Sequence, residues 1–256
     1  MVYDKAGRAE EAVATYRSAT RAQPNDYRIY LDFGNYYLNR GQFQQAEELY
    51  RRVVELAPAF SNGHINLGLA RMQQGRFAEA EKSLTAALRI RKSAVLLVNL
   101  GALYYAQERF EDAARFFEEA IAMGPATSLR YRNLGDAYRR LGRARHASDA
   151  YRKGRALVEQ DVARNPRDAS SRAQLGLFSA FLGDQFRAEF ELTQALAMDP
   201  ENTFMLRDAI IAYESMGKRA KSLELARKAP PALLEELKRQ PDLKKLKADL
   251  RFESRD

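Results

Sequence analysis

Amide and acid side chains recur along the chain at nearly constant spacing. The row consists of Asp32, Asn66, Asn99, Asn133, Gln174 and Asp208, at intervals of 34, 33, 34, 41 and 34 residues. A carboxamide offers both a donor and an acceptor, so a row of carboxamides can hydrogen-bond the backbone of an extended peptide. The same spacing also suits hydrogen bonds between neighbouring helices of the protein, and the sequence leaves both interpretations open.

A second group of residues suggests phosphoryl transfer. Asp32, Phe33 and Gly34 have the composition of the triplet with which protein kinases bind magnesium. Such a site also needs a glycine-rich phosphate loop, a lysine on a strand and a His-Arg-Asp loop, and the sequence contains none of these. It has no cysteine, and its two histidines, His64 and His146, lack partners at metal-ligand spacing. We therefore expect no enzyme, no cofactor and no metal site.

The composition predicts a folded helical protein. Of the 256 residues 46% are hydrophobic, and the longest apolar stretch, from Ala94 to Ala106, is interrupted by Asn99. A membrane span needs about 18 consecutive apolar residues, so we expect none here. The N-terminus lacks a basic region followed by an apolar run, which makes the cytoplasm the expected location.

The net charge of +8 allows several classes of partner. An acidic protein, a nucleic acid and an anionic lipid surface all complement a basic chain. Most basic residues alternate with acids, which is typical of a solvated surface and makes nucleic acid the less favoured alternative. A basic cluster near the C-terminus is the exception, formed by Lys238, Arg239, Lys244, Lys245, Lys247 and Arg251.

An internal repeat explains the kinase-like triplet. The pair Phe33-Gly34 recurs as Leu67-Gly68, Leu100-Gly101, Leu134-Gly135 and Leu175-Gly176. About twelve residues after each glycine stands an alanine, and four residues further on a large residue: Tyr50, Leu84, Phe117, Tyr151 and Leu192. Prolines close most units, at Pro24, Pro58, Pro125, Pro166 and Pro200. Asp32 is then simply the sixth position of a repeat that begins at Tyr27.

This pattern resembles the tetratricopeptide repeat. The resemblance covers nearly the whole chain and implies an all-α fold, a right-handed α-solenoid of helix-turn-helix repeats. The small residues are expected where two helices cross closely. A glycine separates the two helices of most units, where a left-handed conformation is needed, and Glu108 takes that place in one unit.

The register divides the chain into three parts. Residues 1–26 read as the second helix of a partial repeat, residues 27–230 as six units, and residues 231–256 as C-terminal capping helices. The units are 27–60, 61–93, 94–127, 128–168, 169–202 and 203–230. The unit at 128–168 has seven extra residues, about two helical turns, which predicts a longer second helix.

The chain begins in the middle of a repeat, so we expect it to be the C-terminal part of a longer protein. The tail from Gln240 to Phe252 resembles those of bacterial tetratricopeptide proteins in which a serine/threonine kinase, an adenylate cyclase or a winged-helix regulator precedes the repeats. End-to-end association through the incomplete first repeat is an alternative, purely structural role.

In the family, the first helices of the repeats line a concave groove. The resemblance therefore implies a site for an extended peptide or partner protein, formed by Asn35, Asn66, Asn99, Asn133, Gln174, Arg28, Arg132, Asp136, Arg139, Arg140, Arg207, Tyr105 and Phe181. The amides would hold the peptide backbone, the arginines would hold acidic groups, and the apolar residues would form side-chain pockets. Exposed arginines paired with local acids are the alternative.

Overall fold

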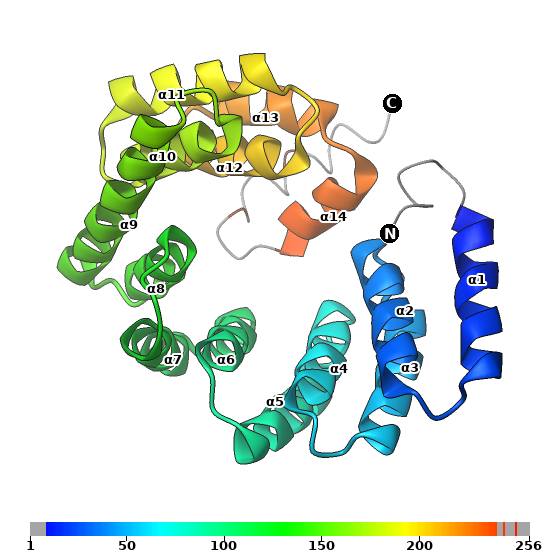
Figure 1. Ribbon diagram of the computed structural model, residues 1–256. Coiled ribbons are helices and arrows are strands. Elements are labelled where there is room, and N and C mark those ends of the chain that lie inside the picture. Colours follow the sequence, from blue (N-terminus) through cyan, green and yellow to red (C-terminus); the bar gives the residue numbers. More distant parts are fainter. Residues whose placement is uncertain (1–8, 240–242, 244–248, 250–256) are drawn as a thin grey trace. The chain divides into compact units, whose positions relative to one another are not determined.

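The computed structural model of the protein describes residues 9–239 together with Leu243 and Asp249 (Figure 1). Within these residues it has fourteen helices and no strand. The helices are α1 (Ala9–Ala22), α2 (Tyr27–Asn39), α3 (Phe43–Leu56), α4 (Ser61–Gln73), α5 (Phe77–Ile90), α6 (Ala94–Ala106), α7 (Phe110–Met123), α8 (Ser128–Arg140), α9 (Ala144–Arg164), α10 (Ala169–Phe181), α11 (Gln185–Met198), α12 (Thr203–Ser215), α13 (Arg219–Lys228) and α14 (Pro231–Arg239).

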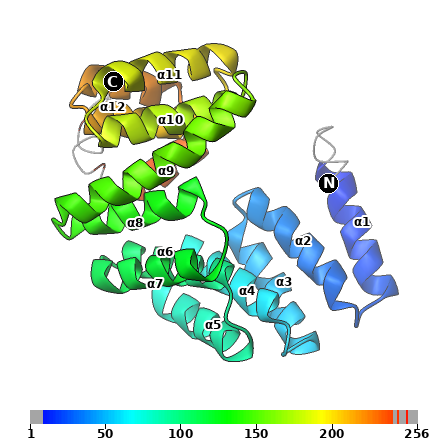
Figure 2. The ribbon, with the colours of Figure 1, turned by 60° about the vertical axis from the view of Figure 1, so that its left-hand side comes forward.

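Consecutive helices pack as antiparallel pairs. The pairs are α2 with α3, α4 with α5, α6 with α7, α8 with α9, α10 with α11, and α12 with α13 (Figure 2). Contacts group the pairs into two compact units, residues 1–124 and 125–256, which we call unit 1 and unit 2. The predicted all-α fold of helix-turn-helix repeats is confirmed. Residues 1–8 of the predicted partial repeat lie outside the described residues.

Five of the six pairs have a glycine on the first helix where it meets the second, and α12 of the sixth pair has none. A Cβ atom on Gly101 would lie 2.5 Å from Cε1 of Phe117, the large residue of the second helix, and one on Gly34 would lie 2.5 Å from Cε1 of Tyr50. Gly68, Gly135 and Gly176 face Leu84, Tyr151 and Leu192 in the same way. These large side chains are at most 2% exposed, so the glycine lets the two helices approach closely around a buried side chain.

Local signals set the helix ends. Five first helices, α2, α6, α8, α10 and α12, begin at polar caps. In each, the side chain of the cap accepts a hydrogen bond from a backbone N–H group of the helix; the caps are Asp26, Ser93, Thr127, Asp168 and Asn202. Between the helices of each pair a glycine takes a positive φ, from 72° to 81°, at Gly41, Gly75, Gly142, Gly183 and Gly217. The exception is Glu108, with φ 59°.

The pair in residues 128–168 contains an unusually long helix. Helix α9 has 21 residues, whereas α7 and α11 have 14 each. Gly154 lies in this longer helix, where a Cβ atom would lie 2.5 Å from Cζ of Phe178 on α10. The close approach lets α9 pack against the first helix of the next pair, with Val158 also buried.

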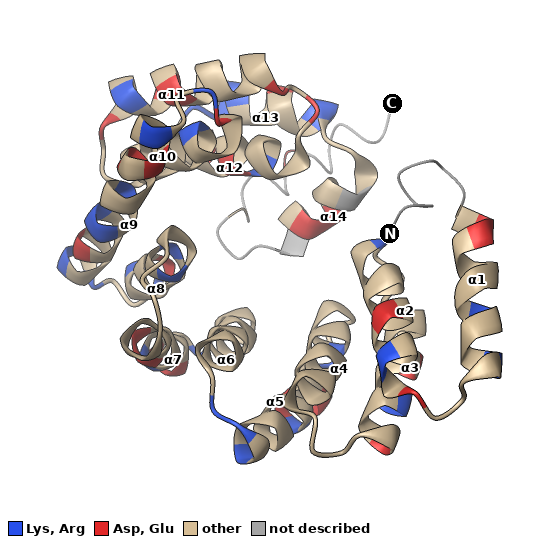
Figure 3. Ribbon diagram, viewed as in Figure 1, with Lys and Arg blue, Asp and Glu red and all other residues tan. Residues whose placement is uncertain are grey.

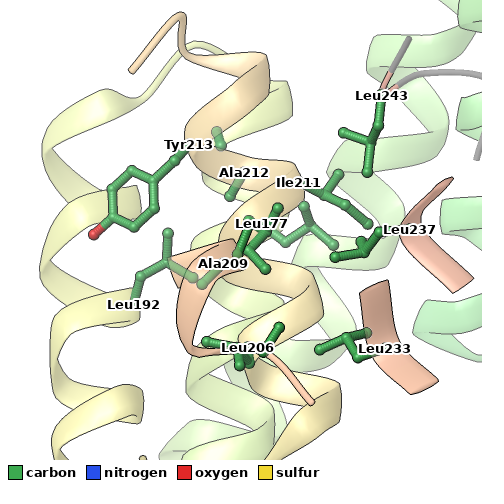
Figure 4. Close-up of a cluster of buried hydrophobic side chains, with 14 of the residues drawn as sticks. Leu177, Leu192, Leu206, Ala209, Ile211, Ala212, Tyr213, Leu233, Leu237 and Leu243 are labelled. Carbon is green, nitrogen blue, oxygen red and sulfur yellow. The ribbon is translucent and has the colours of Figure 1, made fainter. Parts of the chain in front are cut away.

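The last described helix covers part of α12. Leu233 and Leu237 of α14 are buried in one cluster with Leu206 and Ile211 of α12, and Leu243 joins them (Figure 4). Helix α14 corresponds to the first of the predicted capping helices. The second one, from Leu243 to Leu250, and most of the basic cluster with it, lies outside the described residues, which here include only Leu243 and Asp249.

A buried carboxylate on α3 accepts hydrogen bonds from α4 and from the turn between α4 and α5. Glu47 on α3 is 2% exposed and accepts hydrogen bonds from Arg71 Nε at 3.0 Å, Gln74 Nε2 at 2.9 Å and Arg76 NH1 at 2.5 Å. Burial alone would raise the pKa of Glu47, but the hydrogen bonds from Gln74, Arg71 and Arg51 hold it at about 2. The ion pairs therefore favour the charged carboxylate and fix the second helix of one pair against the next pair.

Replacing Glu108 by glycine is expected to stabilise unit 1. An L-residue in the left-handed region costs roughly 1–2 kcal/mol, part of which is offset by the greater flexibility of an unfolded glycine. We expect Glu108→Gly to raise the free energy of local opening at α6 and α7 by about 0.5–1 kcal/mol, measured by amide hydrogen exchange. The matched control is Gly75→Ala, at φ 74° between α4 and α5, which should lower the free energy of local opening of those two helices by a similar amount. A destabilised Glu108→Gly variant would contradict this account of the turn.

Glu47 is expected to make unit 1 sensitive to acid. The folded pKa of about 2 lies below the ordinary value of 4.5, so the stabilisation is present above pH 4.5 and is lost as the pH falls toward 2. The shift corresponds to about 3 kcal/mol. We expect Glu47→Gln to lower the unfolding free energy by about this amount at pH 7, and the deficit to shrink as the pH falls to 2.

The control for this titration is Glu55→Gln on the same helix. Glu55 pairs with Arg52 at 3.0 Å, but its side chain is 61% exposed, so a change of less than about 0.5 kcal/mol is expected. Denaturant unfolding between pH 2 and pH 7 measures both variants. A Glu47→Gln deficit that stays constant over this range would show that the charge of Glu47 is not what stabilises the contact.

Candidate functional site

The structure places the predicted amides on the first helices of the repeats, and two of them bond each other. Asn35 Oδ1 on α2 accepts hydrogen bonds from the Tyr50 hydroxyl at 2.8 Å and from Asn66 Nδ2 on α4 at 3.2 Å. Burial raises the pKa of Tyr50, so its hydroxyl remains a donor. In this part of unit 1 the amides hydrogen-bond across neighbouring helices of the protein. Of the two interpretations that the sequence left open, this is the one in which the amides bond within the protein.

The remaining amides differ from these two. Gln174 Oε1 on α10 accepts a hydrogen bond from Ser128 Oγ on α8 at 3.0 Å, which leaves its NH₂ group as a donor. Asn99 on α6 and Asn133 on α8 are half-buried, and their side chains have no hydrogen-bond partner among residues 9–239. Among the described residues, Asn99 and Asn133 are therefore the amides of the row whose donor and acceptor are both unused, whereas Gln174 has only its NH₂ group left.

The two acids at the ends of the row are also different. Asp32 is exposed. Asp208 on α12 is only 4% exposed, and its Oδ1 accepts hydrogen bonds from Arg132 NH1 at 3.0 Å and from Arg207 Nε and NH2, both at 3.3 Å. The contact between Arg132 and Asp208 joins α8 to α12, two repeats apart in the sequence.

A cavity of about 470 Å³ lies beside this ion pair. Three consecutive first helices of unit 2 line it: Ser128, Leu129 and Arg132 on α8, Ser170, Gln174, Leu177 and Phe178 on α10, and Phe204, Met205, Arg207 and Asp208 on α12. Burial alone would lower the pKa of Arg132, but the carboxylates of Asp208 and Asp136 raise it above the ordinary value. These carboxylates therefore favour the charged form of Arg132.

A second group of predicted residues surrounds Tyr151. The Tyr151 hydroxyl donates to Asp136 Oδ1 at 2.7 Å and accepts a hydrogen bond from Arg139 Nε at 3.2 Å. The Arg139 guanidinium lies 5.5 Å from the ring centroid of Phe181. Burial, followed by the charge of Asp136, raises the pKa of Tyr151. These residues form a polar cluster, and predicted Arg140 lies half-buried in the last turn of α8.

Two predicted residues lie away from both groups. Arg28 on α2 donates from Nε to Asp26 Oδ1 at 2.9 Å and from NH2 to Oδ2 at 2.7 Å, so this exposed arginine pairs with the acid that caps its own helix. Tyr105 on α6 packs edge-on against Phe110 with a ring distance of 5.2 Å. The cavity therefore gathers Arg132, Gln174 and Arg207 of the predicted site.

Basic and acidic residues alternate along the helices of both units (Figure 3). Across the described ranges, no cluster of three or more histidine, aspartate or glutamate side chains is arranged to hold a metal ion. Among the helices described, none is long and apolar enough to cross a membrane.

The stacked antiparallel helix pairs, five of which have a glycine where the two helices approach, define a helical-repeat protein. Two models of the tetratricopeptide repeat match the sequence, one over residues 1–58 and 31–95 and the other over residues 71–135. Together they cover residues 1–135, more than half of the 256 residues. The chain therefore belongs to the tetratricopeptide repeat family.

Comparisons with individual proteins agree with this fold. The chain is 23% identical over 227 residues to human protein O-mannosyl-transferase TMTC3, an alignment that covers 88% of this chain and 24% of that protein. Two other curated relatives are matched over 12% and 36% of their lengths, so the chain spans only a minor part of these relatives.

Solved structures show the same architecture. A chain of the APC/C hetero-tetramer Cut9-Hcn1 superposes with a TM-score of 0.62 at 16% identity, over 88% of this chain and 43% of that chain. The pilF protein of Pseudomonas aeruginosa superposes with a TM-score of 0.55 at 19% identity, over 89% of this chain and all of that chain. At these identities the likeness concerns the fold alone.

Proposed function

We propose that the protein binds an extended peptide segment of a partner protein along the first helices of its repeats, and that the cavity between α8, α10 and α12 is the principal contact. Proteins of the tetratricopeptide repeat family generally mediate protein–protein interactions, and the fold is typically a non-enzymatic scaffold. The proposal concerns which surface of this chain serves that role and what kind of ligand it takes.

The cavity is the observation that carries this proposal. Its volume of about 470 Å³ falls in the range of roughly 300–1,000 Å³ that is typical of ligand sites. Its wall combines apolar side chains, such as Leu177 and Phe178, with the Gln174 amide and two arginines. A few polar groups set in an apolar wall can fix the orientation of a bound segment while the apolar groups supply contact area.

The amides extend this surface along the backbone of a ligand. Asn133 lies on α8, the helix that also contributes Arg132 to the cavity, and its amide has no partner in the described part of the chain. The NH₂ group of Gln174 is available in the next repeat. One donor or acceptor in each repeat matches the need of an extended chain, whose own N–H and C=O groups must be satisfied on binding.

The polar groups of the cavity support binding rather than catalysis. Asp208 already accepts hydrogen bonds from two arginines of the protein, so its Oδ1 is occupied by internal partners. Each arginine is itself paired with that carboxylate. These groups can recognise charge and shape, which is what an interaction module requires.

We further propose that these repeats form the docking part of a longer protein in the bacterial cytoplasm, with a signalling domain before them. Support comes from the relatives, in which the aligned repeats make up 24% of one protein and 12% of another. Immunoblotting the source cells with an antibody against residues 128–215 tests this, because a band well above 29.1 kDa is expected.

A peptide selection tests the proposed groove. A random library of acetylated, amidated decapeptides is passed over the immobilised chain, and the retained peptides are measured for affinity. We expect Asn133→Ala with Gln174→Ala to weaken them about thirtyfold, because two lost hydrogen bonds cost about 2 kcal/mol, while the free energy of unfolding falls only by the roughly 1 kcal/mol of the lost hydrogen bond between Ser128 and Gln174.

The control for this selection is Gln160→Ala, an exposed amide on the second helix α9, which should have no effect. Equal affinities for the native chain and the double variant would move the binding site away from α8 and α10. A library that yields no retained peptide would contradict peptide binding altogether.

A further inference from the structure

The cavity wall contains an uneven set of charges. Arg132 and Arg207 both donate to the same atom, Oδ1 of Asp208, at distances of 3.0 and 3.3 Å. The side chains of these arginines are 16% and 20% exposed, and both line the cavity. One buried carboxylate therefore serves two guanidinium groups; the charge of Asp136 also acts on Arg132, which leaves Arg207 to be balanced by a second negative charge.

The second negative charge comes from α14. Arg207 NH1 lies 3.3 Å from Oε1 of Glu236, whose side chain is 45% exposed. Helix α14 is held beside α12 by Leu233 and Leu237, which are buried independently of this ion pair. A half-exposed ion pair contributes about 0–1 kcal/mol, so another carboxylate can replace Glu236 at low cost without displacing the helix.

The surroundings of Arg207 add an apolar requirement. Phe204 is 67% exposed and Leu129 is 53% exposed, and both line the cavity beside the buried residues Leu177, Phe178 and Met205. The guanidinium carbon of Arg207 lies 5.4 Å from the ring centroid of Phe204, so the charged and apolar parts of the wall adjoin. A ligand that covers both parts needs an acidic group next to a large apolar group.

Resting on the proposed function, we propose that the cavity selects peptides in which an acidic side chain adjoins a large apolar one, and that the ligand carboxylate takes the place of Glu236 on Arg207. Glu236 then acts as an internal competitor for the acidic group. The exchange conserves charge, because one carboxylate replaces another on the same guanidinium. The apolar neighbour of the acid covers Phe204 and Leu129, which removes exposed apolar surface from water.

The experiment uses two degenerate octapeptide libraries with acetylated and amidated ends. Both have three random residues on either side of a fixed pair, which is Glu-Leu in one library and Gln-Leu in the other. We expect the full chain to capture the Glu-Leu library at least tenfold better, because a charge-assisted hydrogen bond to a partly buried arginine is stronger than the neutral one that glutamine offers. Capture is quantified by mass spectrometry at 150 mM salt.

Two variants locate the acidic group. Arg207→Gln is expected to bring the capture ratio close to one. Glu236→Gln removes the competitor and leaves every residue of the cavity wall in place, so it is expected to raise capture of the Glu-Leu library about threefold with the Gln-Leu library unchanged. Arg152→Gln is the control, because this exposed arginine of α9 pairs with Asp149 at 2.7 Å on a second helix.

The outcomes separate the two proposals. Equal capture of both libraries by the native chain, or a preference that neither Arg207→Gln nor Glu236→Gln alters, overturns the acidic subsite and leaves peptide binding in place. Capture of neither library overturns both proposals. Glu236→Gln keeps the test decisive if Arg207→Gln fails to fold, since its increase is expected only when Glu236 and the ligand compete for the same guanidinium.

Discussion

The close approach of a glycine on the first helix to a large side chain on the second, present in five of the six pairs, is the contact on which these repeats depend. Phe117 occupies the space where Gly101 would carry a Cβ, and it is 2% exposed. Because one face of the first helix packs against the second helix in this way, its other face is the one that can line the proposed groove. Asn133 and Arg132 lie immediately before the Leu134-Gly135 pair, so the residue that closes the repeat also fixes the direction in which these polar side chains project.

Ion pairs inside the repeats consume much of the positive charge. Glu47 accepts hydrogen bonds from two arginines of neighbouring elements, and Glu191, which is 1% exposed, pairs with Arg172 at 2.5 Å and Arg187 at 2.9 Å. A net charge of +8 is therefore a poor guide to where an anion binds. What distinguishes Asp208 is that both of the arginines that share it, Arg132 and Arg207, also line a cavity between three first helices, which is a property of the site rather than of the whole chain.

The sequence predicts the repeats well because each repeat depends on contacts close in the chain. Glycine spacing gave the helix pairs, and the single departure at Glu108 coincides with the only positive φ found outside glycine among the described residues. The site was harder to predict. Asn35 and Asn66 have the spacing of a ligand row but bond each other, and the same amide can satisfy either role. The contact from Arg132 to Asp208 spans 76 residues and two repeats, and no local pattern encodes it. Ser128 and Leu129 also line the cavity, and the sequence did not predict this, because the cavity is formed by helices that are distant in the chain.

The position of α14 limits the length of the groove on α12. Ile211, which the repeat register places toward the groove, is 9% exposed and packs with Leu233 and Leu237. The groove face of α12 is therefore covered at Ile211 and open at Phe204, one end of a helix that runs from Thr203 to Ser215. In the proposed binding mode an extended ligand would reach only the N-terminal half of α12, where Arg207 lies beside Phe204. Arg207 is already hydrogen-bonded to Asp208 and lies 5.4 Å from the Phe204 ring centroid. Little ordering of this side chain would therefore remain to be done on binding, and such preorganisation would favour selectivity.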